Sequence, residues 1–155
     1  MFVLIIGSAP DALEARSFNR KLFQGVVAIN NAWNVRTDWD YCIFPDDFPE
    51  NRRPRENKEQ RLIGSEEYVP LQNKYGGFVY SGGTMAFTAG YWVLGHLNPS
   101  AIAYIGCDMV YDGTETHFYG KGTPDPLRKD PTLKNLRAKS ARLEAIAAYQ
   151  NCSIF

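Results

Sequence analysis

Short apolar runs alternate with polar or glycine-rich clusters along the chain. The runs are residues 2–6, 26–29, 78–80 and 102–105, and each ends abruptly at small or polar residues. Strands of a parallel sheet are buried on both faces, so they occur in sequences as uninterrupted apolar runs. The pattern therefore predicts an α/β protein with a mostly parallel sheet.

The clusters that end these runs contain residue types suited to ligand binding. They are Gly7-Ser8-Ala9-Pro10, Asn30-Asn31, Ser81-Gly82-Gly83 and Gly106-Cys107-Asp108. Open α/β sheets bind ligands just beyond the carboxyl ends of their strands. We therefore expect the clusters to line one cleft.

Helical spacing predicts the elements between the strands. Residues 84–97 are almost entirely apolar, which indicates a helix buried against the sheet. A helical stretch follows Asp11 and ends at Gly25, and Thr132 caps a final helix. Further strands are expected at residues 41–44 and 152–155. The elements predict one domain over residues 1–155, a Rossmann-like three-layer sandwich.

Residues 49–77 interrupt this rhythm with Pro49, Pro54, Pro70 and a charge-rich run, and show no strong period. We interpret them as a long loop, as we do residues 109–131. Loops of this length are commonly lids or binding loops, while others have no order. Both alternatives stay open for residues 49–77.

Composition limits the classes of partner. The 155 residues include 17 basic and 17 acidic side chains, so no global field attracts nucleic acid or an anionic membrane surface. A local pocket for an anion, and an oligomer, are both allowed. Cys42, Cys107 and Cys152 have no CxxC spacing, which favours buried free thiols over a disulfide framework or a zinc site. With no basic leader and no apolar run of membrane-spanning length, we expect a cytoplasmic protein without a membrane span.

Two glycine- or serine-rich turns open helices, at residues 7–11 and 81–85. Backbone N–H groups and the helix dipole at such a turn favour an anion, usually a phosphate. Neither the G-x-G-x-x-G spacing nor a P-loop is present, which disfavours an ordinary NAD site. Asn30 and Asn31 suit a base edge or a ribose hydroxyl, although simple turn chemistry also explains them.

His117 is the candidate general base. It lies in Thr116-His117-Phe118-Tyr119-Gly120-Lys121-Gly122, downstream of the last apolar run, from where a loop can reach the cleft. Tyr111, Asp112, Tyr119 and Lys121 lie near it in sequence. The other histidine, His96, lies near the end of the apolar helix and is interpreted as a packing residue or one that interacts with the helix dipole at its C-terminus.

The four clusters and the runs before them resemble the family 42 bacterial sialyltransferases, and a related Rossmann-type group that includes the methanopterin-pathway pyrophosphokinases. The matching pieces are Val3-Leu4-Ile5-Ile6-Gly7-Ser8-Ala9-Pro10, Ala28-Ile29-Asn30-Asn31, Ser81-Gly82-Gly83-Thr84-Met85 and Tyr104-Ile105-Gly106-Cys107-Asp108. The resemblance implies that Gly7, Ser8, Asn30, Ser81 and Gly82 surround the cytidine nucleotide of a CMP-linked sugar.

This chain departs from the family pattern at three places. Lys121 stands where the family's His-x-x-Gly-His loop has its second histidine, and Phe78 stands where the family has an arginine. The chain is also much shorter and has lost most of the acceptor-binding insertion. Donor binding therefore survives the comparison better than sialyl transfer does.

The leading hypothesis is a nucleotide-sugar-dependent glycosyltransferase that acts on a glycan acceptor and needs no further cofactor. Its expected catalytic residues are His117, Lys121 and Asp112. Its expected nucleotide contacts are Gly7, Ser8, Ala9, Asn30, Asn31, Ser81, Gly82, Gly83, Asp108, Tyr111 and Tyr119. One alternative is a pyrophosphokinase-like enzyme with Mg²⁺ held by Asp46, Asp47 or Asp108. The other is a non-catalytic nucleotide-binding module.

Overall fold

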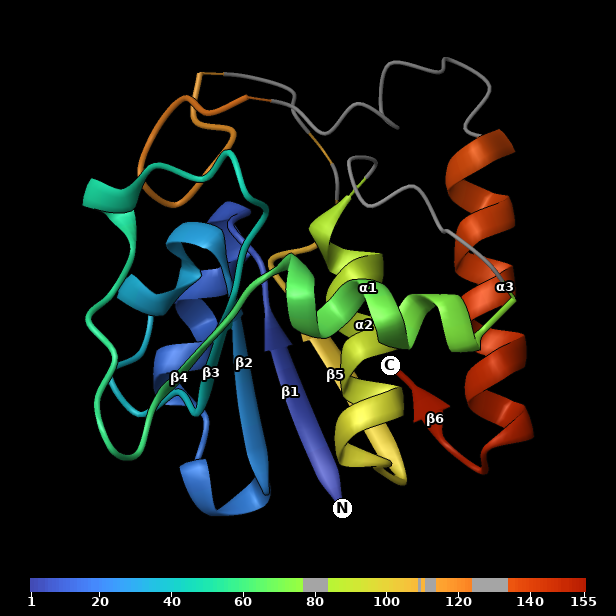
Figure 1. Ribbon diagram of the computed structural model, residues 1–155. Coiled ribbons are helices and arrows are strands. Elements are labelled where there is room, and N and C mark those ends of the chain that lie inside the picture. Colours follow the sequence, from blue (N-terminus) through green and yellow to red (C-terminus); the bar gives the residue numbers. More distant parts are fainter. Residues whose placement is uncertain (77–83, 109, 111–113, 124–133) are drawn as a thin grey trace.

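A computed structural model describes residues 1–76, 84–108, 110, 114–123 and 134–155 (Figure 1). It contains a 6-stranded sheet in the order β4-β3-β2-β1-β5-β6, and every neighbouring pair is parallel. The predicted α/β, Rossmann-like fold is confirmed. The strands are β1 (Phe2–Ile6), β2 (Gly25–Ile29), β3 (Tyr41–Ile43), β4 (Arg61–Ile63), β5 (Ala101–Ile105) and β6 (Ser153–Ile154).

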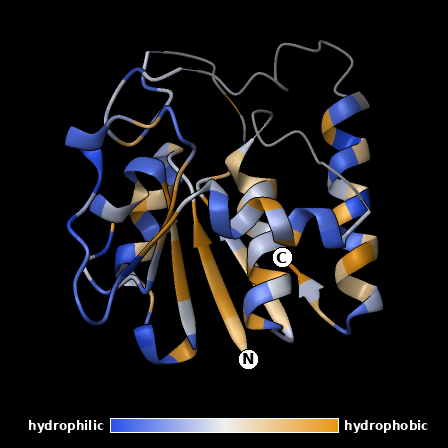
Figure 2. Cartoon of the chain, viewed as in Figure 1, coloured by the Kyte–Doolittle hydropathy of each residue, from blue (hydrophilic) through white to orange (hydrophobic). Residues whose placement is uncertain are grey.

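The central strands are apolar because both of their faces are buried. In β1, Val3 and Ile5 belong to one core cluster, while Leu4 and Ile6 belong to the cluster on the other face of the sheet. Figure 2 shows the hydrophobic strands at the centre of the molecule and hydrophilic colours over the connection between β3 and β4. Successive side chains of a strand point to opposite faces of the sheet, so each strand contributes to two separate hydrophobic cores.

The helices α1 (Ser65–Lys74), α2 (Met85–Leu97) and α3 (Lys134–Tyr149) share the first of these clusters. The predicted apolar helix is α2, and its first ten residues are buried. Thr84 caps it, since its hydroxyl oxygen accepts a hydrogen bond of 3.2 Å from the N–H of Ala86. The predicted final helix is α3, and Thr132, its expected cap, lies outside the described residues.

Short 3₁₀ helices cover the other face of the sheet. They are η1 (Pro10–Ser17) and η3 (Asn30–Asn34), which belong to the second core cluster, while η2 (Arg20–Leu22) has no buried residue. The single helix expected after Asp11 is wrong, because its inward side chains are Ala12 and Ala15, three residues apart, while Leu22 is exposed. Three-residue spacing fits a 3₁₀ turn. Gly25 begins β2 and does not end a helix.

The segment 49–77 is not one long loop. It contains η4 (Glu50–Arg52), the strand β4, which pairs with β3, and α1, which packs on α2. The strand expected at residues 78–80 lies outside the described residues. No helix in the described part of the chain is long and apolar enough to cross a membrane.

Cys42 and Cys152 are buried free thiols, and Cys107 is partly buried. Burial raises the pKa of the Cys42 thiol to about 12, so this thiol stays protonated at neutral pH.

Candidate functional site

An open cavity of about 980 Å³ lies beyond the carboxyl ends of β1 and β2. The connections after β1, β2, β3 and β5 all contribute to its wall. Its described lining residues are Ser8, Asn30, Asn31, Trp33, Asn34, Phe48, Asn51, Arg52, His117, Phe118, Tyr119, Lys121, Gly122 and Thr123. The structure therefore brings Ser8, the asparagine pair, His117, Tyr119 and Lys121 together, as the sequence predicts.

Asn30 is held by the backbone in an unusual conformation. Its φ of 51° is left-handed, a region that asparagine tolerates better than most residues. Its carbonyl accepts a contact of 3.7 Å from the Cys42 thiol, and its side-chain Oδ1 is buried with no hydrogen-bond partner in the described structure. Buried acceptors in proteins normally have a hydrogen-bond partner, so this oxygen is a place where a further donor group can be accommodated.

The segment around His117 forms a small hairpin. His117 and Gly120 exchange both backbone hydrogen bonds at 2.9 Å, and Gly120 has a φ of 109° that favours glycine. The N–H of Phe118 donates a hydrogen bond of 2.9 Å to the carbonyl of Ser8. This bond docks the hairpin on the turn after β1 and closes one side of the cavity.

The His117 ring is 9% exposed and is held by its neighbours. Its Nδ1 shares a hydrogen bond of 2.9 Å with the Thr116 hydroxyl, whose oxygen also accepts from the N–H of Gly122 at 3.1 Å. A Cβ on Gly122 would lie 2.4 Å from the ring, so glycine is needed there. Burial lowers the pKa of His117, and the charge of Asp108 opposes this more weakly. The ring is therefore neutral at pH 7 and can accept a proton.

Trp33 lines the cavity and joins two of the segments that form its wall. Its indole N–H donates a hydrogen bond of 2.9 Å to the carbonyl of Arg52, which ties η3 to η4. Arg52 and Lys121 are both exposed and line the cavity from different segments. None of the described side chains that line it is a carboxylate. The wall is thus cationic and rich in amides and aromatic rings, which suits an anionic ligand that carries a planar ring.

Some predicted nucleotide contacts lie elsewhere. The N–H of Gly7 donates to the carbonyl of Ile105 at 2.8 Å, and the N–H of Ala9 donates to the carbonyl of Gly106 at 3.0 Å. These backbone donors of the first turn are satisfied inside the protein, and both residues are buried and outside the described lining of the cavity. Asp108 lines a separate cavity of about 280 Å³ between α2, β5 and α3.

The aspartates considered for Mg²⁺ do not form a metal site within the part of the chain that the structure describes. Among the described residues, no group of three or more His, Cys, Asp or Glu side chains is arranged to hold a metal ion. Asp46 accepts a hydrogen bond of 2.7 Å from the hydroxyl of Ser65. The remaining candidates lie outside the described residues and stay predictions: Ser81, Gly82, Gly83, Tyr111 and Asp112.

Comparison with known proteins gives no further guide. No family model, no curated protein and no solved structure matches the chain. The resemblance to the family 42 sialyltransferases stays an interpretation of short motifs.

Several lining residues were missed by the sequence reasoning. They are Trp33, Asn34, Phe48, Asn51 and Arg52. One signal was available, since Asn34 follows Asn31 by three residues and η3 places both in the wall. The interpretation of residues 49–77 as a binding loop also pointed toward Asn51 and Arg52 without selecting them.

Proposed function

We propose that this chain is a glycosyltransferase that moves a sugar from a CMP-linked donor to a hydroxyl of a glycan acceptor. One observation carries the proposal: a neutral histidine, His117, lies in the wall of the same cavity as Arg52 and Lys121, whose described lining has no carboxylate. A proton acceptor beside a cationic wall suits a reaction in which an anionic group leaves.

The reaction forms a bond between the acceptor oxygen and the anomeric carbon, while the bond from that carbon to the phosphate oxygen breaks. The acceptor proton passes to the His117 ring, and the electron pair of the broken bond stays on the phosphate. A positioned base of this kind contributes about 10²- to 10⁴-fold in rate. Cationic side chains stabilise the charge that grows on the departing nucleotide.

The rest of the wall suits the nucleoside. Aromatic side chains such as Trp33 and Phe118 offer faces on which a base or a sugar can pack. Asn30 lines the cavity, and an asparagine amide can pair with a base edge or a ribose hydroxyl.

The alternatives are less well supported by the same cavity. Pyrophosphoryl transfer needs Mg²⁺ held by carboxylates. The candidates Asp46, Asp47 and Asp108 all lie outside the described lining of the cavity, and Asp46 is hydrogen-bonded to Ser65. A non-catalytic module predicts nucleotide binding with no turnover, so the two are separated by experiment.

The test is the His117→Ala variant. Calorimetric titration with CMP should give wild type and variant dissociation constants within about threefold, because the base acts on the acceptor. Turnover of CMP-sialic acid with a panel of glycans should fall about 100-fold or more in the variant. The control is His96→Ala, which removes the exposed histidine that stacks on Trp92 at 4.7 Å, far from the cavity lining.

Unchanged turnover in His117→Ala would reject the assignment of the base. CMP binding with no turnover in the wild-type protein would favour the non-catalytic module. Binding of ATP or GTP only in the presence of Mg²⁺ would favour the pyrophosphokinase alternative.

A further inference from the structure

Two adjacent arginines after β3 have different environments. The guanidinium of Arg53 donates hydrogen bonds of 3.0 and 2.7 Å to the carbonyl of Phe48 and one of 3.2 Å to the carbonyl of Asp46. It also lies 4.7 Å from the centre of the Phe44 ring. Arg53 therefore folds the connection after β3 onto itself, and its hydrogen-bonding capacity serves the fold.

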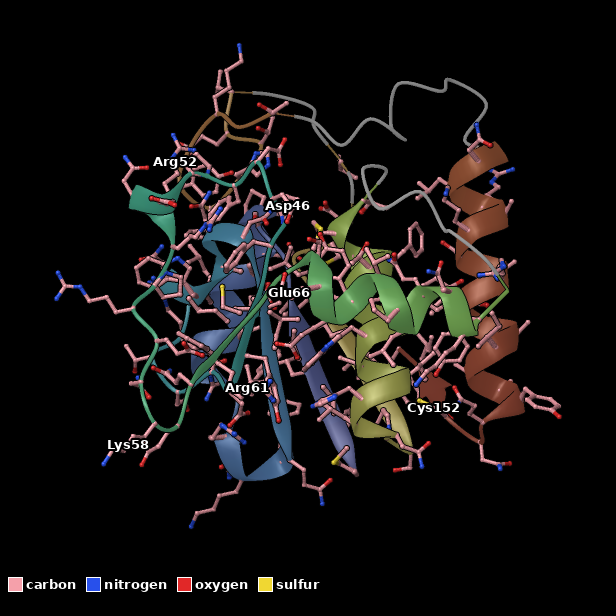
Figure 3. The ribbon with its side chains drawn as sticks, viewed as in Figure 1. Asp46, Arg52, Lys58, Arg61, Glu66 and Cys152 are labelled. Carbon is pink, nitrogen blue, oxygen red and sulfur yellow. The ribbon has the colours of Figure 1, made fainter. Side chains whose placement is uncertain are left out.

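Arg52 is held by its backbone while its side chain is left available. Its N–H donates to the carbonyl of Pro49 at 2.9 Å, and its carbonyl accepts from the Trp33 indole at 2.9 Å. Arg52 lines the large cavity, and its side chain forms no ion pair with the described residues. Figure 3 shows Arg52 at the end of the molecule where the strands end, whereas Lys58 lies at the opposite end.

Lys121 supplies a second positive charge from another segment. It belongs to the chain just after the His117 hairpin, which Phe118 anchors to Ser8. Like Arg52, it forms no ion pair with the described residues. Two positive side chains in the wall of one cavity favour an anionic ligand there.

We propose that Arg52 binds the phosphate of the ligand, with Lys121 contacting the same group from the other wall. The planar guanidinium presents paired N–H donors that match phosphate oxygens, and a backbone held on both sides limits the entropy lost on binding. The naming of the ligand as a nucleotide rests on the proposed function. The phosphate site itself rests on the cavity, and it predicts that nucleotides bind in preference to nucleosides.

The experiment is a calorimetric titration of CMP, cytidine and inorganic pyrophosphate into wild type, Arg52→Gln and Arg55→Gln. Arg55 is an exposed arginine outside the described cavity lining, so the same substitution there is the matched control. Arg52→Gln should weaken CMP about 10- to 100-fold, which is the effect of losing a charged hydrogen-bond donor. Cytidine should bind wild type and Arg52→Gln equally, and Arg55→Gln should resemble wild type throughout.

The outcomes separate this inference from the proposed function. Unchanged CMP affinity in Arg52→Gln overturns the phosphate assignment even if His117→Ala abolishes transfer. Arg52 would then contact another part of the CMP-linked sugar, such as a carboxylate of the sugar. Equal weakening of cytidine and CMP overturns it as well. Pyrophosphate binding that depends on Arg52, without CMP binding, keeps the phosphate site and rejects the CMP-linked donor. If the wild-type protein binds neither CMP nor pyrophosphate, both proposals are rejected.

Discussion

Burial in the cavity wall makes the protonation of His117 a property of the folded chain. In the unfolded chain the imidazole has its ordinary pKa of 6.5, and in the folded chain burial lowers that pKa. Protonation therefore favours the unfolded chain, because water solvates the imidazolium better than the wall does. The same effect that prepares the ring as a base makes it a source of acid instability.

The sign of the pH dependence follows from proton uptake. Above pH 6.5 both states hold a neutral ring, so His117 adds no pH dependence there. Below that pH the unfolded chain binds more protons, so the free energy of unfolding decreases as pH falls toward the pKa of the folded state. We expect urea denaturation at pH 7.5 and 5.5 to show a larger loss of stability in wild type than in His117→Asn. Equal losses in the two proteins would contradict the assignment.

At the residue scale, the chemical type of a side chain predicted some of the residues that line the cavity, but not all of them. His117, Lys121 and Asn30 were selected because their types are suited to proton transfer, anion binding and hydrogen bonding, and all line the cavity. Gly7 was selected for its backbone N–H, which donates to Ile105 instead. A residue's type shows what it can bind, but only the neighbouring strand shows whether that capacity is already used.

At the scale of elements, α1 shows why residues 49–77 have no strong hydrophobic period although they contain a helix. Its buried side chains are Tyr68 and Gln72, and a buried glutamine gives no apolar period. Gln72 is accommodated because its amide donates a hydrogen bond of 3.0 Å to the hydroxyl of Thr88 on α2. By contrast, α2 was predicted correctly because it is buried nearly all round. Polar contacts between helices are invisible to a hydrophobic pattern.

Pro70 is the second reason that α1 was missed, and it carries a prediction. It lies inside the helix, where proline has no N–H to donate to the preceding turn. Because Pro70 is exposed, alanine there adds a backbone hydrogen bond without disturbing packing. We expect Pro70→Ala to raise the free energy of unfolding by about 1 to 3 kcal/mol, after allowing for the more flexible unfolded chain. Chemical denaturation measures it.

The control for Pro70→Ala is Asn73→Ala, an exposed position in the same helix. That change improves helix propensity alone and should add less than about 0.7 kcal/mol. A gain at position 70 no larger than at position 73, or a loss, would mean that α1 does not continue through Pro70.

At the scale of the whole molecule, the sheet joins two parts at the β1–β5 pair. The strands β2, β3 and β4 extend from one side of β1, and β5 and β6 extend from the other. Reversal of strand order at such a point opens a crevice in many α/β proteins. Here Gly7 and Gly106 bring the two connections into backbone contact at this point, and the large cavity lies beside them over β1 and β2.

The sequence predicted the parallel sheet, but it did not predict that the cavity lies over β1 and β2, to one side of the β1–β5 contact. Apolar runs report burial on both faces, which is a property of each strand alone. The position of the cavity depends on which loops touch, and that is decided by contacts such as the one between Phe118 and Ser8. Backbone contacts between distant segments leave no periodic pattern in the sequence. The position of the cavity is therefore visible only in the folded structure.

The contact between Gly7 and Gly106 is testable through global stability. A Cβ on Gly7 would lie 2.1 Å from the carbonyl oxygen of Gly106 and 2.5 Å from Sγ of Cys107, and the carbonyl belongs to the backbone and cannot rotate away. Gly7→Ala must therefore separate the ends of β1 and β5. We expect a loss of about 3 kcal/mol in the free energy of unfolding, measured by guanidinium denaturation.

Gly25→Ala is the matched control for Gly7→Ala, because Gly25 pairs with β1 on its other side. A Cβ there would lie 3.5 Å from a methyl group of Val3, an ordinary contact, so its stability should change by less than about 1 kcal/mol. Similar effects at both positions would show that the β1–β5 junction adapts to an extra methyl group. A loss confined to Gly7→Ala would mean that this glycine holds the two parts of the sheet together, whichever ligand the neighbouring cavity binds.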